Sequence, residues 1–316
     1  MDTQQNILEK SQNILSQVGK VVVGKDAALV WTLAAILAKG HILIEDIPGV
    51  GKTTMAVAFS RALGLSYNRV QFNPDVLPSD ITGYSVLNQA TGALEYRDGA
   101  VLCNLFLADE LNRATSRTQS ALLEAMEERQ VTVDGKTHPV PSPFTVIATQ
   151  NPTGAAGTQL LPDSQIDRFM ICLQMGYPEP KDEVTMLLKR QGRDPMEAVS
   201  PVVTAQELSQ MQQMVSQTFV SEDLARYIVQ LVDATRRSSF LRRGASPRAT
   251  LALAAMAKAV AQLQGRDYVV PGDVQDTFGT TLAHRLQVSA EAEMKDMDVK
   301  QALKAILDSV PAPELR

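Results

Sequence analysis

The sequence has few cysteines, few histidines and no excess of positive charge. Of its 316 residues only Cys103 and Cys172 are cysteines, and both lie in apolar segments, so we expect buried reduced thiols. The formal net charge of −5 excludes a global basic field that would hold a nucleic-acid backbone, but not a local basic patch. The three histidines have no cysteine or carboxylate at ligand spacing, so we expect them to be structural or surface residues.

The sequence also lacks an apolar run that could cross a bilayer. The longest candidates, LVWTLAAILA and TLALAAMAKAVAQL, are too short or too interrupted. Its first residues, MDTQQNILEK, show no basic region followed by an apolar run, so we expect no signal peptide and a cytoplasmic protein. With 45 % hydrophobic and 21 % charged residues, the chain has the composition of a globular protein with a sizeable core.

Short apolar runs alternate with helical patterns over the first half of the chain. HILIE, VLCNLFLADE and FTVIATQNP read as buried strands, and KTTMAVAFSRALG and TSRTQSALLEAMEERQ as helices. A further apolar helix, AALVWTLAAILAKG, is expected to end at Gly40. Strands that alternate with helices predict an α/β fold with a parallel sheet covered on both faces.

Two inserts interrupt this alternation, and the second half of the chain differs from the first. Residues 84–101 and 130–140 each have strand-like halves around a turn, ATG and DG respectively, which predicts two β-hairpins. After YPEP, residues 177–180, β-rich runs almost disappear. We therefore expect two domains, an αβα core over residues 1–178 and an all-helical domain over residues 179–316.

The stretch HILIEDIPGVGKTTMA, residues 41–56, has the order of a phosphate-binding loop: strand, glycine-rich loop, Lys52 and Thr53, then helix. Backbone N–H groups of such a loop face phosphate oxygens, Lys52 adds a positive charge at the outer phosphates, and the Thr53 hydroxyl binds Mg²⁺. The alternative is an ordinary glycine-rich turn with a surface lysine. The residues expected to bind ATP in this loop are Pro48, Gly49, Val50, Gly51, Lys52, Thr53 and Thr54.

Asp46 stands where the Walker A pattern has its first glycine. This position needs a tight turn out of the strand, and aspartate tolerates a left-handed or bridging conformation better than most residues. The carboxylate is expected to point away from the phosphates, because a nearby anion would oppose their binding.

Polar residues follow two other apolar strands. Asp109 and Glu110 end the second strand, where we assign the Mg²⁺ shell to Asp109 and the attacking water to Glu110. Asn151 follows the third strand, where its amide could orient the same water. The alternatives are two solvated carboxylates that cap the next helix and a turn-forming asparagine before proline.

Eight motifs, in order and spread from about residue 21 to residue 248, resemble those of MoxR-type AAA+ ATPases. They are VVVGKD, DIPGVGKTT, QFNPDVLPSDITG, FLADELNRA, TQSALLEAMEERQVTVDG, VIATQNP, LPDSQIDRF and GASPRA. The resemblance implies a P-loop NTPase with an αβα core, two hairpin inserts and a helical lid.

The resemblance also implies a role for several residues. Asn151 would be sensor 1, Arg168 the arginine finger that enters the neighbouring subunit's ATP site, and Arg248 sensor 2, which reaches from the lid to the γ-phosphate. For Arg168 the alternative is a salt bridge to Asp163 or Asp167, and Arg113 is a second candidate for the inter-subunit contact. The residues implied to lie against adenine are Val22, Val23 and Gly24.

An arginine finger implies a homo-oligomeric ring, which in this family is a hexamer. The resemblance further implies a chaperone that remodels or activates a target protein, together with a separate von Willebrand factor A domain protein. Three alternatives stay open: an ATP-switched scaffold with little turnover, a metal-chelatase-type motor, and a motor acting on nucleic acid. The net charge of −5 argues against a motor acting on nucleic acid. The chain has one strongly basic stretch, which a subunit interface explains more simply; its arginines are Arg236, Arg237, Arg242 and Arg243.

Overall fold

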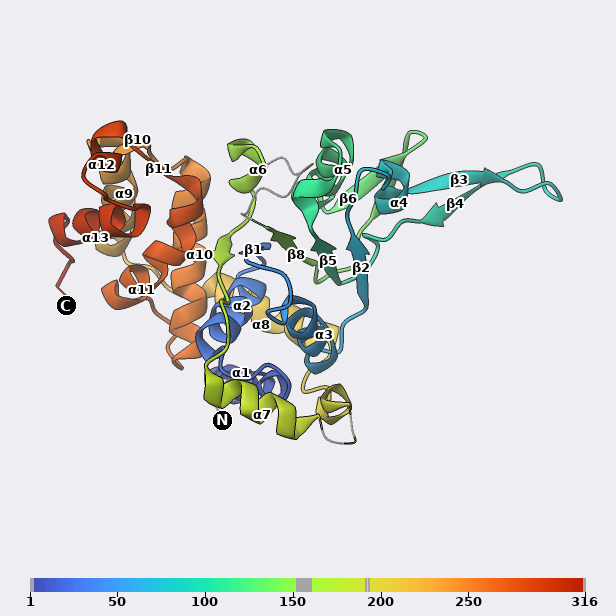
Figure 1. Cartoon of the computed structure of the whole chain (residues 1–316), viewed down its shortest axis with the longest axis horizontal. Coiled ribbons are helices and arrows are strands. Elements are labelled where there is room, and N and C mark those ends of the chain that lie inside the picture. Colours follow the sequence, from blue (N-terminus) through green and yellow to red (C-terminus); the bar gives the residue numbers. More distant parts are fainter. Residues whose placement is uncertain (1–2, 152–160, 191, 193, 315–316) are drawn as a thin grey trace.

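A five-stranded parallel sheet forms the centre of the computed structural model, which describes residues 3–151, 161–190, 192 and 194–314 (Figure 1). Its strand order is β2-β5-β8-β1-β9, and each neighbouring pair runs parallel. The strands are β1 (Ile42–Glu45), β2 (Tyr67–Gln71), β5 (Leu105–Asp109), β8 (Thr145–Gln150) and β9 (Ile171–Leu173). The α/β fold and its parallel sheet are therefore as the sequence predicted.

Successive side chains of the inner strands enter two different hydrophobic clusters. Leu105 and Leu107 pack with the helices on one face, while Phe106 and Ala108 pack with those on the other. Helices α1, α2, α3 and α8 cover the first face, and α4 and α5 the second. Their bounds are α1 (Thr3–Gly19), α2 (Asp26–Leu37), α3 (Lys52–Ala62), α4 (Pro78–Thr82), α5 (Ser116–Glu128) and α8 (Ala205–Gln217).

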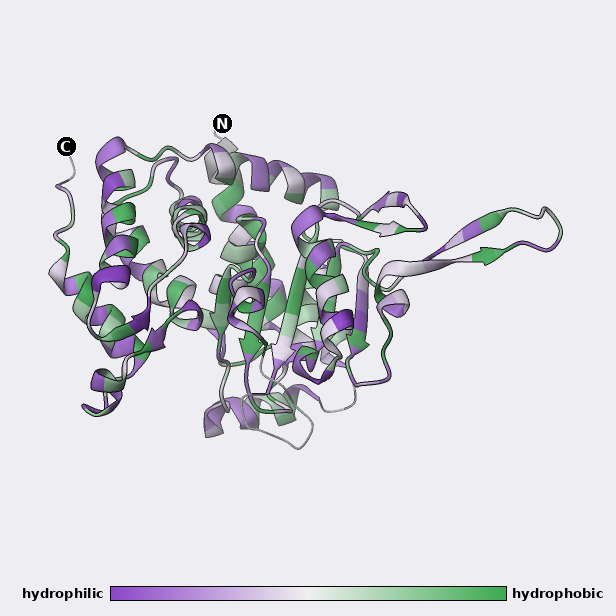
Figure 2. Ribbon diagram, turned by 90° about the horizontal axis from the view of Figure 1, so that it is seen from above, coloured by the Kyte–Doolittle hydropathy of each residue, from purple (hydrophilic) through white to green (hydrophobic). Residues whose placement is uncertain are grey.

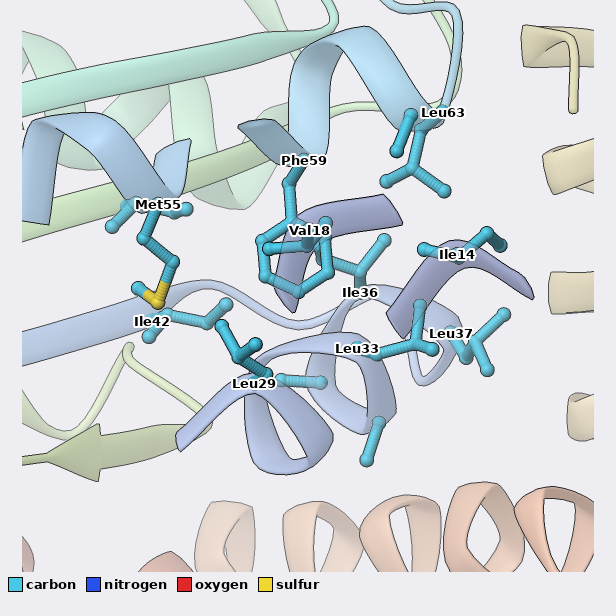
Figure 3. Close-up of a cluster of buried hydrophobic side chains, with 14 of the residues drawn as sticks. Ile14, Val18, Leu29, Leu33, Ile36, Leu37, Ile42, Met55, Phe59 and Leu63 are labelled. Atoms are coloured by element: carbon cyan, nitrogen blue, oxygen red, sulfur yellow. The ribbon is translucent and has the colours of Figure 1, made fainter. Parts of the chain in front are cut away.

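The cluster on the first face joins the N-terminal helices to the strand that precedes the glycine loop. Val18 of α1, Leu33 of α2 and Phe59 of α3 point toward one another beside Ile42 of β1 (Figure 3). Each of these side chains is fully buried. Full burial of a large apolar side chain stabilises the folded state by roughly 1.5–3 kcal/mol. Because β1 and α3 both contribute side chains to this cluster, the packing fixes the two ends of the loop that joins them.

Both expected hairpins are present. The first, β3 (Gly83–Leu87) with β4 (Leu94–Asp98), projects far from the body of the molecule (Figures 1 and 2). The second, β6 (Gln130–Val133) with β7 (Lys136–Pro139), turns at Asp134 and Gly135, both of which have positive φ as a tight hairpin turn requires. The ring of Tyr96 in β4 stacks on that of His138 in β7, with centroids 3.6 Å apart, and so links the two hairpins.

A helical domain with its own core follows. Its central helices are α9 (Glu222–Arg237), α10 (Pro247–Leu263), α11 (Pro271–Leu282) and α13 (Val299–Ser309). A short antiparallel pair, β10 (Leu241–Arg243) with β11 (Gln287–Val288), adds a feature that the helical pattern did not predict. The remaining short elements are α6 (Asp163–Ile166), α7 (Pro180–Lys189), α12 (Ala290–Glu293), η1 (Leu111–Arg113), η2 (Pro195–Ala198) and η3 (Ala283–Arg285).

The boundary between residues 178 and 179 stays a prediction. Helix α8 lies after it in the sequence, yet its buried residues Leu208, Met211 and Val215 belong to the same cluster as α1, α2 and α3. None of the helices described here combines the length and apolar character needed to cross a bilayer.

Candidate nucleotide-binding site

The glycine loop joins the end of β1 to the start of α3. Gly49 and Gly51 have φ values of 87° and 96°, a conformation that L side chains rarely adopt. A Cβ added at either position would meet no atom within 4 Å. The loop therefore needs glycine because of its backbone shape, and its concave side is open for a ligand.

Lys52, the first residue of α3, lies among acidic groups. Its Nζ donates a hydrogen bond to the backbone carbonyl of Asp46, 2.7 Å away. Burial lowers the pKa of Lys52, while the carboxylates of Asp46, Asp109 and Glu110 act in the opposite direction. The loop lysine and the two acids at the end of β5 thus share one electrostatic site.

Asp46 does not have a left-handed backbone, and its carboxylate bonds three backbone N–H groups. It is absent from the described residues that have positive φ. Its carboxylate accepts hydrogen bonds from the backbone N–H groups of Ile47, at 2.8 Å, and of Met175 and Gly176, both at 2.6 Å. Of the two conformations expected for Asp46, left-handed or bridging, the left-handed one is therefore wrong. The carboxylate fixes the start of the loop to the chain that follows β9.

Asp109 and Glu110 are held on the two sides of Thr149, which lies near the end of β8. The Thr149 hydroxyl donates to Asp109 Oδ1 at 2.7 Å and accepts from the Glu110 backbone N–H at 2.8 Å. Asp109 Oδ2 pairs with Arg69 at 2.7 Å, and Glu110 pairs with Arg113 at 2.9 Å. Sequence reasoning missed Thr149 and Arg69; only the neighbouring position of β2, β5 and β8 in the sheet brings them to Asp109.

Glu110 itself has a left-handed backbone, with φ 57° and ψ 43°. A non-glycine residue in this region costs roughly 1–2 kcal/mol, so the surrounding contacts must hold it there. The oxygen donors of Asp109 and Thr53, a carboxylate and a hydroxyl, are of the type that Mg²⁺ prefers. The described residues therefore fit a magnesium–nucleotide complex at this edge of the sheet.

Asn151 directly follows β8 and is half-buried. Its backbone carbonyl accepts a hydrogen bond, 3.4 Å long, from the side-chain amide of Asn112, which lies just beyond Glu110. The chain that follows β8 thereby contacts the turn η1 that follows Glu110. Pro152 of the same motif lies outside the described residues.

A cavity of about 430 Å³ opens beside the glycine loop. Val22 and Val23 line it, as do Gly49, Val50, Gly51, Thr53 and Thr54. Pro48, Lys52, Asp109 and Glu110 are not among its lining residues. Gly24 is not among them either; a Cβ there would lie 2.0 Å from Asp182 Oδ2, so Gly24 packs against α7. The opposite wall was not predicted from the sequence and consists of Pro178, Met186, Lys189, Arg190, Asp194, Pro195 and Met196.

Arg168 and Arg248 lie together, but not at this cavity. Both pair with the carboxylate of Glu127 near the end of α5, Arg168 at 3.1 Å. Asp163 pairs with Arg243 and Asp167 with Arg285, so the alternative pairing of Arg168 with either aspartate is wrong. Neither Arg168 nor Arg248 lines the cavity of its own chain.

The chain matches known proteins in sequence and in fold. The family described as "ATPase family associated with various cellular activities (AAA)" matches residues 41–171, and the AAA lid domain matches residues 233–306. A crystal structure of a protein from Cytophaga hutchinsonii superposes with a TM-score of 0.91 at 35 % identity and covers 98 % of this chain and 97 % of that one. The fold is therefore that of an AAA+ ATPase with a helical lid, which confirms the predicted fold class.

Relatives in sequence define the family more narrowly. Chaperone MoxR1 of Mycobacterium tuberculosis is 37 % identical over 96 % of this chain and 82 % of its own length. YeaC of Bacillus subtilis is 42 % identical over 96 % of this chain and 94 % of its own, and protein MoxR of Methylorubrum extorquens is 29 % identical over 94 % and 93 %. The chain belongs to the MoxR family of AAA+ ATPases, as the resemblance of its motifs indicated.

Proposed function

We propose that the chain hydrolyses ATP with Mg²⁺ and uses the nucleotide cycle to remodel or activate a target protein. One observation carries the proposal: Lys52, Asp109 and Glu110 interact electrostatically across the ends of β1 and β5. They do so beside a cavity whose volume lies in the range of small-molecule sites. Family membership supports nucleotide binding, and the presence of both acids supports turnover.

Each residue has a role in this proposal. The loop N–H groups and Lys52 hold the outer phosphates, and Thr53 with Asp109 binds Mg²⁺, which neutralises charge that develops on the transferring phosphoryl group. Glu110 polarises the attacking water, and Asn151 orients it. Val22 and Val23 lie against the adenine, with Gly24 behind them.

We further propose a hexameric ring in which Arg168 and Arg248 serve the ATP site of the adjoining subunit. Their shared contact with Glu127, away from the cavity of their own chain, supports this assignment. A guanidinium supplied from a neighbour stabilises transition-state charge, so hydrolysis depends on assembly. Arg113 is the second candidate for that contact. A separate von Willebrand factor A domain protein would present the target.

One observation favours a second function, an ATP-switched scaffold with little turnover. The carboxylate of Glu110 is paired with Arg113, and that of Asp109 with Arg69. The Glu110 oxygen that accepts from Arg113 is not free to accept a hydrogen bond from the attacking water. In a motor, Glu110 would have to leave its ion pair with Arg113 before it could act on water, whereas in a scaffold it would stay paired.

Phosphate release and nucleotide binding, measured together, decide between the two. Wild type, Glu110→Gln and Lys52→Ala are compared, with Glu293→Gln as a matched control because Glu293 is an exposed acid in the lid. We expect Glu110→Gln to bind a fluorescent ATP analogue normally and to lose about 100-fold or more in phosphate release. Lys52→Ala should lose binding, and Glu293→Gln should match wild type.

Equal, low rates of phosphate release for wild type and Glu110→Gln, with tight binding in both, would establish the scaffold. Failure of wild type to bind ATP with Mg²⁺ would contradict both functions.

A further inference from the structure

The buried side chain of Arg285 joins the lid to the segment that carries Arg168. Arg285 ends the turn η3 in the lid, and its side chain is only 2 % exposed. Its Nη1 donates to Asp167 Oδ1 at 3.2 Å, and its Nη2 donates to the backbone carbonyl of Phe169 at 2.6 Å. One guanidinium thus contacts the residue before Arg168 and the residue after it.

Other lid groups support the same two residues. The Ser246 hydroxyl donates to both carboxylate oxygens of Asp167, at 2.9 and 3.1 Å. His284 Nε2 accepts from Arg285 Nε at 3.2 Å, which orients the Arg285 guanidinium toward these residues; an accepting Nε2 makes no hydrogen bond to the Phe169 carbonyl 3.1 Å away. Burial lowers the pKa of Arg285 to about 10, so the guanidinium is still charged at neutral pH and its ion pair with Asp167 persists.

We propose that Arg285 is a positioning residue for Arg168: it holds the Asp167 carboxylate on one side of Arg168 and the Phe169 backbone carbonyl on the other, and so aims the Arg168 guanidinium at the neighbouring subunit. The proposal rests on the proposed function, in which Arg168 completes a site in trans. The Asp167 carboxylate and the Phe169 carbonyl are two hydrogen-bond acceptors, one on each side of Arg168. Bonding both at once requires two donors at a fixed separation, which the planar guanidinium supplies and a lysine ammonium does not. Because Arg285 belongs to the lid, the aim of Arg168 depends on the position of the lid against the core.

Arg285→Lys tests this, because it keeps the charge and loses the fork. A misplacement of about 1 Å at a reacting group costs on the order of 100-fold in rate, so we expect kcat to fall about 10- to 100-fold. The affinity of the variant for a fluorescent ATP analogue should stay within about twofold of wild type, because Arg285 does not line the cavity. Gln287→Ala is the control, since Gln287 bonds Asp163 across the same lid–core contact without touching residues 167–169.

Mixed rings separate positioning from a structural role. In rings of Arg285→Lys with Lys52→Ala subunits, an intact Arg168 faces an intact loop, so activity should return. In rings of Arg285→Lys with Arg168→Ala subunits, no correctly placed Arg168 is available, and activity should stay low. If Arg285 instead served its own subunit's nucleotide site, the two mixtures would give the opposite pattern.

Energy transfer between labelled subunits shows that mixed rings form. Asp167→Asn, which breaks the same ion pair from the other side, replaces Arg285→Lys if that variant does not fold, and the same two mixtures decide. A folded Arg285→Lys or Asp167→Asn variant with near-wild-type kcat would overturn the role of Arg285 but not the trans site. Rescue of either variant by Arg168→Ala subunits would do the same. Full activity of Arg168→Ala by itself would overturn the trans site and this inference together.

Discussion

The carboxylate of Asp46, at the start of the glycine loop, accepts a hydrogen bond of 2.6 Å from the backbone N–H of Met175, a residue 129 positions later in the chain. A second bond of the same length comes from the Gly176 N–H. The residue that departs from the Walker A pattern therefore connects the phosphate-binding loop to the segment that leaves β9 toward α7. Helix α7 in turn forms part of the wall of the nucleotide cavity.

Replacing Asp46 by glycine, the residue that the Walker A pattern has, should destabilise the protein. The buried N–H of Met175 and the half-buried N–H of Gly176 would lose their acceptor, at a cost of about 1–3 kcal/mol each. We expect a lower midpoint of urea unfolding for Asp46→Gly and an intermediate value for Asp46→Asn, which keeps one acceptor oxygen. A midpoint for Asp46→Gly at or above that of wild type would show that these hydrogen bonds contribute no stability.

Two glycine-to-alanine substitutions should have opposite effects. A Cβ at Gly99, where the β3–β4 hairpin leaves the core, would lie 2.2 Å from both the Gly83 backbone nitrogen and the Ile81 carbonyl oxygen. Gly99→Ala should therefore destabilise by about 1–3 kcal/mol, because backbone atoms must move. Gly279 is exposed within α11 with open space around it, so Gly279→Ala should stabilise by about 0.5–1 kcal/mol. Urea unfolding of both variants checks the pair, and equal shifts would contradict it.

His41 should make the stability of the protein depend on pH. Its Nε2 lies 3.1 Å from the Met126 carbonyl, and its Nδ1 accepts from the Val146 N–H at 3.0 Å, which is the pattern of a neutral ring. Burial, with a smaller contribution from the positive charge of Arg129, lowers the pKa of His41 to about 4. The unfolded chain then binds more protons than the folded one between pH 6.5 and 4, so the free energy of unfolding should fall as pH falls through this range.

His41→Gln keeps an acceptor and a donor but removes the titrating group. The free energy of unfolding, measured by urea unfolding from pH 7 to pH 4, should fall less steeply for this variant than for wild type. The difference in this fall between the two proteins should reach at most about 3 kcal/mol at pH 4. Buried His284, whose pKa burial lowers to about 3, contributes with the same sign in both proteins. Identical pH profiles for the two would show that His41 does not titrate as its burial implies.

Local sequence determined the elements and the residues at the strand ends. Alternating apolar runs required strands buried on both faces, DG required a hairpin turn, and two glycines beside Lys52 required a loop open to phosphate. The end of α2 was predicted less well, since Lys39, not Gly40, takes the left-handed conformation. Gly40 lacks a side chain because Met170 occupies the space, with its Cβ 2.6 Å from where a Cβ of residue 40 would lie.

The partners of the charged residues came only from the tertiary structure. Asp46 with Met175, Arg69 with Asp109, and Glu127 with Arg168 join segments between 40 and 130 positions apart. A charge pattern along the chain states which residues can pair but not which do, because strand order and the docking of the lid set the distances. The sequence by itself therefore determined that this chain has a parallel sheet with a phosphate-binding loop, while the tertiary structure decided what each acid and arginine contacts.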